Sequence, residues 1–216
     1  MAVRGVIFDV GGVLVESPFV AALRWRDELD IPNDVLAIMF AEYSAIPPAG
    51  SPTPLWHQVE KGELELDVFV TTVREQFAVH LDPDHPAMHL RGRDFNVFRE
   101  AGAHWAMVHR ARELRGEGMV TAILTNNVKE WSEWREVVPL DAFDVVIDSC
   151  EVGLRKPDPA IWHMTLAQMG LRASETVFLD DHQDNVDAAR ALDIRSVLVG
   201  ADIEAALQEL DAVLAS

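Results

Sequence analysis

The sequence has few basic residues, one cysteine and no long apolar run, and each shortage excludes a class of protein. Lys and Arg number 18 against 36 Asp and Glu, which gives a formal net charge of −18 at pH 7. Such a charge repels DNA, RNA and anionic membrane surfaces. An anionic substrate would therefore need a local cation to be held, either a metal ion or a lysine.

The cysteine, Cys150, cannot form a disulfide within the chain, so a reducing compartment fits. We interpret Cys150 as a small buried apolar side chain rather than a nucleophile. No apolar run has the length of a membrane span, and the first apolar stretch is broken by Asp9 too early for a signal peptide. We therefore expect a soluble, cytoplasmic protein with no nucleic-acid or membrane partner, either a monomer or a homodimer.

Hydrophobic residues make up 49% of the 216 residues, enough for a substantial core. Residues 16–98 carry helical patterns and no convincing strand, with punctuated loops at 46–52 and 82–96. From residue 99 onward, strand and helix patterns alternate. The expected strands span 120–125, 145–148, 176–179 and 196–199. This alternation predicts a parallel sheet with right-handed crossovers.

The predicted fold is therefore α/β, with a Rossmann-like parallel sheet core and an inserted α-helical cap. Residues 1–15 and 99–216 would form the core, and residues 16–98 would form the cap domain. The insertion follows the first strand, at the sheet edge where ligands bind in open α/β folds.

The first strand, at residues 6–8, runs directly into Asp9 and the glycine pair Gly11 and Gly12. Valine, isoleucine and phenylalanine suit a covered, pleated surface. The glycines permit a sharp turn and leave room for a ligand to come close. A carboxylate at the carboxyl end of a parallel strand lies where ligands bind. From this stretch alone, a surface aspartate in a turn is an equally good interpretation.

Three further polar groups follow apolar runs or lie in rigid loops. Thr125 and Asn126 end the second predicted strand. They would either bind phosphate oxygens there or simply form a polar turn. Lys156 lies in a proline-rich loop and is either a charge-neutralising group or an ordinary surface lysine. Asp180 and Asp181 follow four apolar residues, and two adjacent carboxylates there repel each other unless a cation lies nearby. Hard oxygen ligands point to magnesium rather than zinc.

The order of these motifs resembles the haloacid dehalogenase-like superfamily of aspartate-nucleophile hydrolases. The resemblance covers essentially the whole chain and is closest to the phosphatase-like N-terminal domain of soluble epoxide hydrolases. The stretches that carry it are residues 8–14, 121–126, 149–157 and 177–181.

The resemblance implies a role for each matching residue. Asp9 would attack phosphorus and form an aspartyl-phosphate, while Lys156 would keep Asp9 ionised and offset charge in the transition state. Thr125 and Asn126 would bind the phosphoryl oxygens. The ligands of Mg²⁺ would be Asp9, the backbone carbonyl of Gly11, Asp180 and Asp181, with Asp180 either a ligand or a support for one.

Gly11 departs from the family pattern. Typical phosphatases of this family carry an aspartate two residues after the nucleophile, which protonates the leaving alcohol. A missing general acid costs about 10²–10⁴ in rate. Another group, such as Glu16 or His57, or water would then move the proton, and anomeric or acyl phosphates with good leaving groups would be favoured.

Three functions remain open. The favoured one is a magnesium-dependent phosphatase acting on a small phosphorylated metabolite. The second is a non-catalytic or weakly active module that binds phosphate. The third is a 2-haloacid dehalogenase, which needs no magnesium, so the retained acid pair argues against it. We expect specificity to lie in the cap, where a pocket could be lined by Trp25, Phe40, Tyr43 and Trp56, although such aromatics more often belong to a core.

Overall fold

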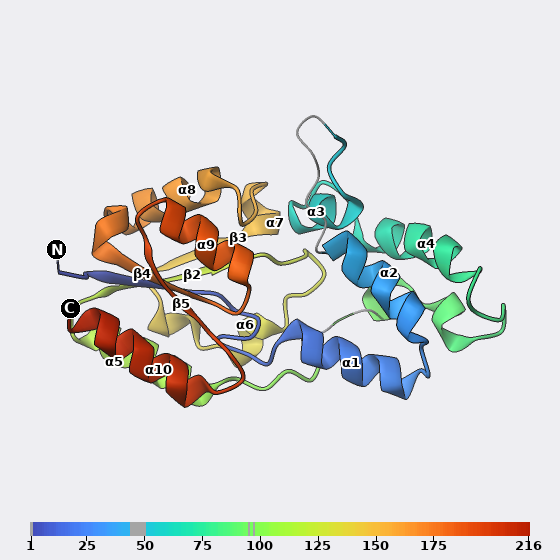
Figure 1. Cartoon of the computed structure of the whole chain (residues 1–216), viewed down its shortest axis with the longest axis horizontal. Helices are drawn as coiled ribbons and strands as arrows, with labels where there is room; N and C mark the ends of the chain where they lie inside the picture. Colours follow the sequence, from blue (N-terminus) through green and yellow to red (C-terminus); the bar gives the residue numbers. More distant parts are fainter. Residues whose placement is uncertain (1, 44–50, 95, 97) are drawn as a thin grey trace.

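A computed structural model describes residues 2–43, 51–94, 96 and 98–216. Within them lies a five-stranded sheet in which every neighbouring pair of strands is parallel and the order is β3-β2-β1-β4-β5 (Figure 1). The strands are β1 (Gly5–Phe8), β2 (Val120–Thr125), β3 (Val145–Asp148), β4 (Thr176–Asp180) and β5 (Arg195–Leu198). The predicted α/β fold with a parallel sheet is confirmed.

The central strand β1 is buried along its whole length. A parallel strand covered on both faces reads as a continuous apolar run, as residues 6–8 do. Phe8 lies opposite Ile123 of β2 and opposite Leu179 of β4. The residues that follow these positions therefore reach the same edge of the sheet, which is where the polar motifs of the sequence lie.

Two layers of helices cover the sheet (Figure 1). One face carries α8 (Pro159–Met169) and α9 (Gln183–Ala191), and the other carries α5 (Trp105–Gly116) and α10 (Ile203–Leu214). The alternation of side chains along β1 divides the core accordingly. Ile7 packs in one cluster with Trp162 of α8, whereas Phe8 packs in the other with Met107 of α5.

Helices also occupy the chain between β1 and α5. They are α1 (Pro18–Glu28), α2 (Asn33–Tyr43), α3 (Leu55–Glu60), α4 (Leu66–Phe77) and two short 3₁₀ helices, η1 (Pro86–His89) and η2 (Gly92–Asp94). We call the described part of Pro18–Asp94 the helical insert; it lies beside the sheet edge (Figure 1). The proposed domain boundaries stay a prediction.

The two predicted loops of this region have different outcomes. Residues 46–50 lie outside the described residues. The loop predicted at 82–96 instead contains η1 and η2, because Pro86 fixes the first turn of η1 and the ring Nδ1 of His85 accepts a hydrogen bond from Ala87 N–H. Two shorter helices of the core, α6 (Trp134–Val137) and α7 (Ser149–Val152), were not predicted either.

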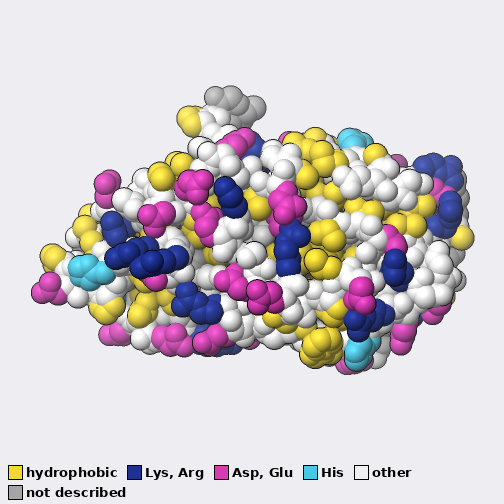
Figure 2. Space-filling model, turned by 180° about the vertical axis from the view of Figure 1, so that it is seen from behind, with side chains coloured by type: hydrophobic (Ala, Val, Ile, Leu, Met, Phe, Trp, Pro, Cys, Tyr) yellow, Lys and Arg dark blue, Asp and Glu magenta, His cyan; other side chains and the backbone are white. Residues whose placement is uncertain are grey.

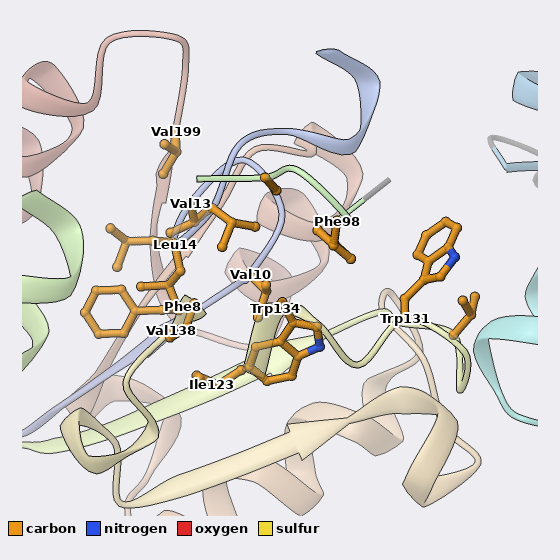
Figure 3. Close-up of a cluster of buried hydrophobic side chains, with 14 of the residues drawn as sticks. Phe8, Val10, Val13, Leu14, Phe98, Ile123, Trp131, Trp134, Val138 and Val199 are labelled. Carbon is orange, nitrogen blue, oxygen red and sulfur yellow. The ribbon is translucent and has the colours of Figure 1, made fainter. Parts of the chain in front are cut away.

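Aromatic side chains continue the core into the insert. Figure 3 shows Phe8 and Trp134 packed under the loop that follows β1, with Phe98 and Trp131 farther along the same cluster. The ring of Trp131 lies 5.7 Å from that of Phe98 and 5.5 Å from that of Trp56 in α3, centroid to centroid. Trp131 therefore joins the sheet core to the insert.

Polar contacts hold α3 against the core as well. The Ser149 hydroxyl donates to the backbone oxygen of Glu60 at 2.6 Å, and Arg155 Nε lies 2.6 Å from Glu60 Oε2. Burial raises the pKa of Glu60, and the charge of Arg155 opposes that rise. Gly62 has a φ of +68°, and a Cβ there would lie 2.5 Å from the backbone oxygen of Cys150.

The surface carries charges of both signs. Figure 2 shows acidic and basic side chains interspersed over the face seen from behind. No helix among the described residues is both long enough and apolar enough to pass through a lipid bilayer.

Replacing Gly62 with alanine should loosen the contact between the insert and the core, in addition to straining the backbone. Gly170→Ala is the matched control, because Gly170 has a φ of +66° with nothing within 4 Å of its would-be Cβ. Both variants should lose about 1–2 kcal/mol of unfolding free energy, because alanine is strained in the left-handed conformation. Gly62→Ala should lose about 1 kcal/mol more and speed hydrogen exchange in α3, as measured by denaturant unfolding and mass spectrometry. Equal losses in the two variants would contradict this.

Candidate active site

Three carboxylates meet at the edge of the sheet. Asp9 follows β1, Asp180 ends β4 and Asp181 comes next, and one oxygen from each lies within 4.8 Å of the others. The pairing of β1 with β4 brings them together, and Asp9 N–H donates to the backbone oxygen of Leu179 at 2.9 Å. The structure thus places the three predicted acidic residues in one cluster.

Lys156 lies between two of these acids. Its Nζ is 2.8 Å from Asp9 Oδ1 and 2.6 Å from Asp180 Oδ2, and its side chain is only 1% exposed. Burial alone would lower the pKa of Lys156, but the charges of Asp180 and Asp9 raise it. The lysine is therefore a buried cation and not a surface side chain, which is the other interpretation of its loop.

Asn126 holds the loop that carries this lysine. Its Nδ2 donates to the backbone oxygen of Lys156 at 2.9 Å, and its Oδ1 accepts from the backbone N–H of Lys156 at 2.8 Å. No local pattern in the sequence indicates this pairing. Thr125, the last residue of β2, is buried, and phosphate binding by Thr125 and Asn126 stays a prediction.

Asp180 is fully buried and fixed from several sides. Besides Lys156, its partners are the backbone N–H of His182 at 2.7 Å and Asn185 Nδ2, which lies 3.1 Å from both oxygens. Asn185 comes from the first turn of α9. Asp181 is more open and accepts a hydrogen bond from Ser17 Oγ at 3.0 Å.

The charges of the cluster fit a divalent cation. Burial raises the pKa of Asp9 to about 7, against the opposing charge of Lys156, and burial together with Asp180 raises the pKa of Asp181 to about 6. Three carboxylates and one ammonium leave two negative charges when all are ionised. Asp9 Oδ1 is buried and close to Lys156, but the contact lacks hydrogen-bond alignment. Oxygen ligands with this charge suit Mg²⁺.

Crowding explains both glycines of the first motif. Gly12 has a φ of +72°, and a Cβ there would overlap the carboxylate of Asp181. A Cβ on Gly11 would lie 2.7 Å from Cδ and 2.9 Å from Cγ of Pro18. Close approach at these positions was predicted, but for a ligand; the structure shows that parts of the chain itself approach.

A pocket of about 900 Å³, counting the part open to solvent, lies over the acidic cluster. Its apolar walls come from both the insert and the core. They consist of Pro18, Phe19, Ala22, Leu36, Phe40, Trp56, Phe69, Phe98, Val128 and Trp131. The other lining residues are Asp9, Gly11, Glu60, Asn126, Lys156, Asp181, His182 and Asn185.

Some residues expected near the pocket do not line it. Trp25 packs against the main core cluster, and the side chain of Tyr43 lies outside what the structure describes. Glu16, suggested as a proton carrier, forms an ion pair with Arg24, and His57 is buried away from the lining. Phe40 and Trp56 do line the pocket, as expected.

Cys150 has the properties of an unreactive thiol. It is half-buried, and its Sγ lies 3.1 Å from Asp148 Oδ1. Burial and the charge of Asp148 raise the pKa of Cys150 to about 12, so almost no thiolate forms at neutral pH. This agrees with the prediction that Cys150 is not a nucleophile, although the side chain is half-buried and contacts a carboxylate rather than being a buried apolar group.

Comparisons with known proteins point to one family. The profile described as haloacid dehalogenase-like hydrolase matches residues 3–193. The chain is 32% identical over 98% of its length to acyl-CoA dehydrogenase family member 10 of Mus musculus, and 30% identical over 99% to bifunctional epoxide hydrolase 2 of Rattus norvegicus. This chain spans 19% of the length of the acyl-CoA dehydrogenase family member and 39% of the length of the epoxide hydrolase. A sesquiterpene phosphatase of Aspergillus oryzae is 28% identical over 88% of this chain and 86% of its own length.

Solved structures share the fold. A HAD-family enzyme of Bacteroides thetaiotaomicron, an aspartate-to-alanine mutant in complex with magnesium and inorganic phosphate, matches with a TM-score of 0.62 at 20% identity. The match covers 93% of this chain and 96% of that one. An L-2-haloacid dehalogenase matches with a TM-score of 0.66 at 20% identity over the whole of both chains.

Gly12→Ala should impair the metal site beyond its cost in stability. Gly153→Ala is its control, because Gly153 has a φ of +70° and open space around its would-be Cβ. Both variants should lose about 1–2 kcal/mol of unfolding free energy. Only Gly12→Ala should displace Asp181, weakening Mg²⁺ binding by about 10–100-fold in isothermal titration calorimetry. Equal Mg²⁺ affinities in the two variants would contradict this prediction.

Proposed function

We propose, from the premise that the chain belongs to the haloacid dehalogenase-like hydrolase family, that it is a magnesium-dependent phosphatase acting through Asp9. The observation that carries the proposal is the buried cluster of Asp9, Asp180, Asp181 and Lys156 at one end of the pocket. Its two uncompensated negative charges require a divalent cation before an anionic phosphate can approach.

Each residue of the cluster has a distinct role in this mechanism. An oxygen of Asp9 attacks phosphorus, the bond to the leaving oxygen breaks, and an aspartyl-phosphate forms. Lys156 keeps Asp9 ionised and offsets the charge that develops on the phosphoryl group. Water then attacks the phosphorus of the intermediate, which releases phosphate and restores the carboxylate.

Other residues hold these groups in place. Asn126 fixes the backbone of Lys156, and Asn185 fixes Asp180, which in turn holds the ammonium group. Mg²⁺ would be held by Asp9, the carbonyl of Gly11 and Asp181, with Asp180 behind them, and would supply positive charge to the phosphoryl oxygens. Preorganised charges of this kind account for most of the catalysis of phosphoryl transfer.

The comparisons support a phosphatase. One relative, whose match covers most of both chains, is named a sesquiterpene phosphatase. One structural neighbour was solved with magnesium and inorganic phosphate. The helical insert contributes apolar residues to the pocket, so we infer that residues 16–98 act as a cap that selects the substrate and excludes water.

A phosphate-binding module without turnover is the second candidate. A dehalogenase is the third, because Gly11 supplies no proton donor and dehalogenases share the fold. In that chemistry, Asp9 attacks carbon and halide leaves without a proton. The dehalogenase reaction needs no magnesium, so the acid pair Asp180 and Asp181 beside Asp9 favours the phosphatase.

Asp9→Asn should lower phosphate release from p-nitrophenyl phosphate by about a thousandfold or more, because the amide cannot form the intermediate. Asp184→Asn, the same change at an exposed position of α9, should leave the rate unchanged. Chelation of Mg²⁺ should abolish release by the unmodified protein.

Two results would contradict the phosphatase. One is release that persists in Asp9→Asn or without Mg²⁺. The other is Mg²⁺-independent chloride release from a 2-chloro acid, which would establish the dehalogenase. Phosphate binding measured by calorimetry, with no turnover in either assay, would establish the binding module.

A further inference from the structure

We propose that the substrate carries its phosphoryl group on a weakly basic oxygen attached to an apolar body, as in an aryl or acyl phosphate. The proposal rests on the phosphatase function and names the substrate class of the same site. Two independent features support it: Pro18 fills the space of a proton donor, and the rest of the pocket offers apolar walls with few uncommitted polar groups.

The first feature is the contact between Pro18 and Gly11. Pro18 is the first residue of α1, and its ring carbons lie 2.7 and 2.9 Å from the position of a Cβ on Gly11. No side chain fits at position 11 without a shift of this rigid ring, because real Cβ atoms do not approach carbon so closely. The absence of an acid there is thus built into the start of α1.

Contacts on both sides keep this helix start in place. The hydroxyl of Ser17 donates to Asp181 Oδ2 at 3.0 Å, and the backbone oxygen of Ser17 accepts from Val20 N–H at 3.0 Å. Ser17 therefore anchors α1 to the acidic cluster. Pro18 cannot withdraw from Gly11 without breaking the contact between Ser17 and Asp181.

The other ionisable groups of the pocket have tasks of their own. Asp9, Lys156 and Asp181 form the charged cluster, and Glu60 is paired with Arg155. Of the ionisable side chains that line the pocket among the described residues, this leaves His182. Protonation of the leaving group by this histidine is the competing explanation that the experiment below tests.

Without a proton donor, the leaving oxygen must depart as an anion. Asp9 forms the new bond to phosphorus, and the electron pair of the broken P–O bond stays on the leaving oxygen. An aryloxide or carboxylate is stable enough to leave in this way, whereas an alkoxide is not. In the second step, water attacks phosphorus, Asp9 leaves as carboxylate, and the proton of the water passes to solvent.

The second feature is the lining beyond the cluster. The insert contributes Phe19, Leu36 and Phe40, and the core contributes Phe98 and Trp131. The rings of Phe19 and Phe40 are stacked, with centroids 5.1 Å apart. Walls of this kind favour an apolar body of the size of an aromatic ring or larger.

Both amide side chains of the pocket already form hydrogen bonds within the chain. Asn126 is bonded to the backbone of Lys156, and Asn185 is bonded to Asp180. A sugar would lose the water around its hydroxyl groups without gaining these partners, and buried polar groups left unpaired reduce binding and transition-state stabilisation. The lining therefore discriminates against polar phosphate esters even when their leaving group is good.

The first test varies the leaving group at nearly constant shape. kcat/KM is measured with Mg²⁺ for a series of substituted phenyl phosphates, with benzyl phosphate as the alkyl member. It should fall by about a thousandfold between p-nitrophenyl and phenyl phosphate and further for benzyl phosphate, because the leaving oxygen carries its full charge. A rate that is independent of leaving-group basicity, and that becomes dependent in His182→Gln, would overturn the proposal and assign the proton to His182.

The second test varies the apolar body at nearly constant basicity. Benzoyl phosphate should be hydrolysed with about tenfold higher kcat/KM than acetyl phosphate. Phe19→Ala should reduce this ratio severalfold, and Trp105→Ala, which removes a half-exposed aromatic ring outside the pocket, should leave it unchanged. A ratio near one in the unmodified protein would overturn the apolar part of the proposal.

The outcomes separate the proposal from the function on which it rests. Equal kcat/KM for benzyl, sugar and phenyl phosphates, all abolished by Asp9→Asn, would overturn the substrate class and leave the phosphatase intact. Absence of turnover with every aryl and acyl phosphate of the two tests would overturn both.

Discussion

The structure depends on one buried cation between two buried carboxylates. Lys156 lies within 2.8 Å of Asp9 and 2.6 Å of Asp180, and the ammonium has almost no contact with solvent. Removing one member of such a group costs about 3–5 kcal/mol, because the remaining charges stay buried without a partner. The ends of β1 and β4 and the loop of Lys156 must therefore keep one arrangement. This rigidity is what a preorganised catalytic site requires.

The hydrogen bonds around this group extend the constraint outward. Asn126 fixes the lysine from β2, and Asn185 fixes Asp180 from α9. The insert is held next to them, since Glu60 is paired with Arg155, the residue before the lysine. Trp131 packs against Trp56 and joins the apolar core to the insert. The parts that build the charged cluster thus also position the walls of the pocket.

The sequence predicted those features that depend on local pattern. Apolar runs predicted the strands. Asp9 and Asp180 lie at the carboxyl ends of two of these strands, and parallel strands end at one edge of the sheet, so their proximity could be predicted as well. It did not predict α6 and α7, which have four residues each and are too short to show a period. Contacts such as Ser17 with Asp181, 164 residues apart, depend on how the insert packs and leave no local pattern.

The two glycines after Asp9 show how that packing reaches the chemistry. Gly12 lets Asp181 approach the first loop, and Gly11 lets Pro18 approach it from the other side. Ser17 connects the two contacts, since it precedes Pro18 and binds Asp181. The missing acid, the start of α1 and the position of Asp181 are therefore parts of one arrangement. A side chain at position 11 would have to displace Pro18, which begins the helix that contributes Phe19 and Ala22 to the apolar wall, so the first motif is fitted to the helix that follows it.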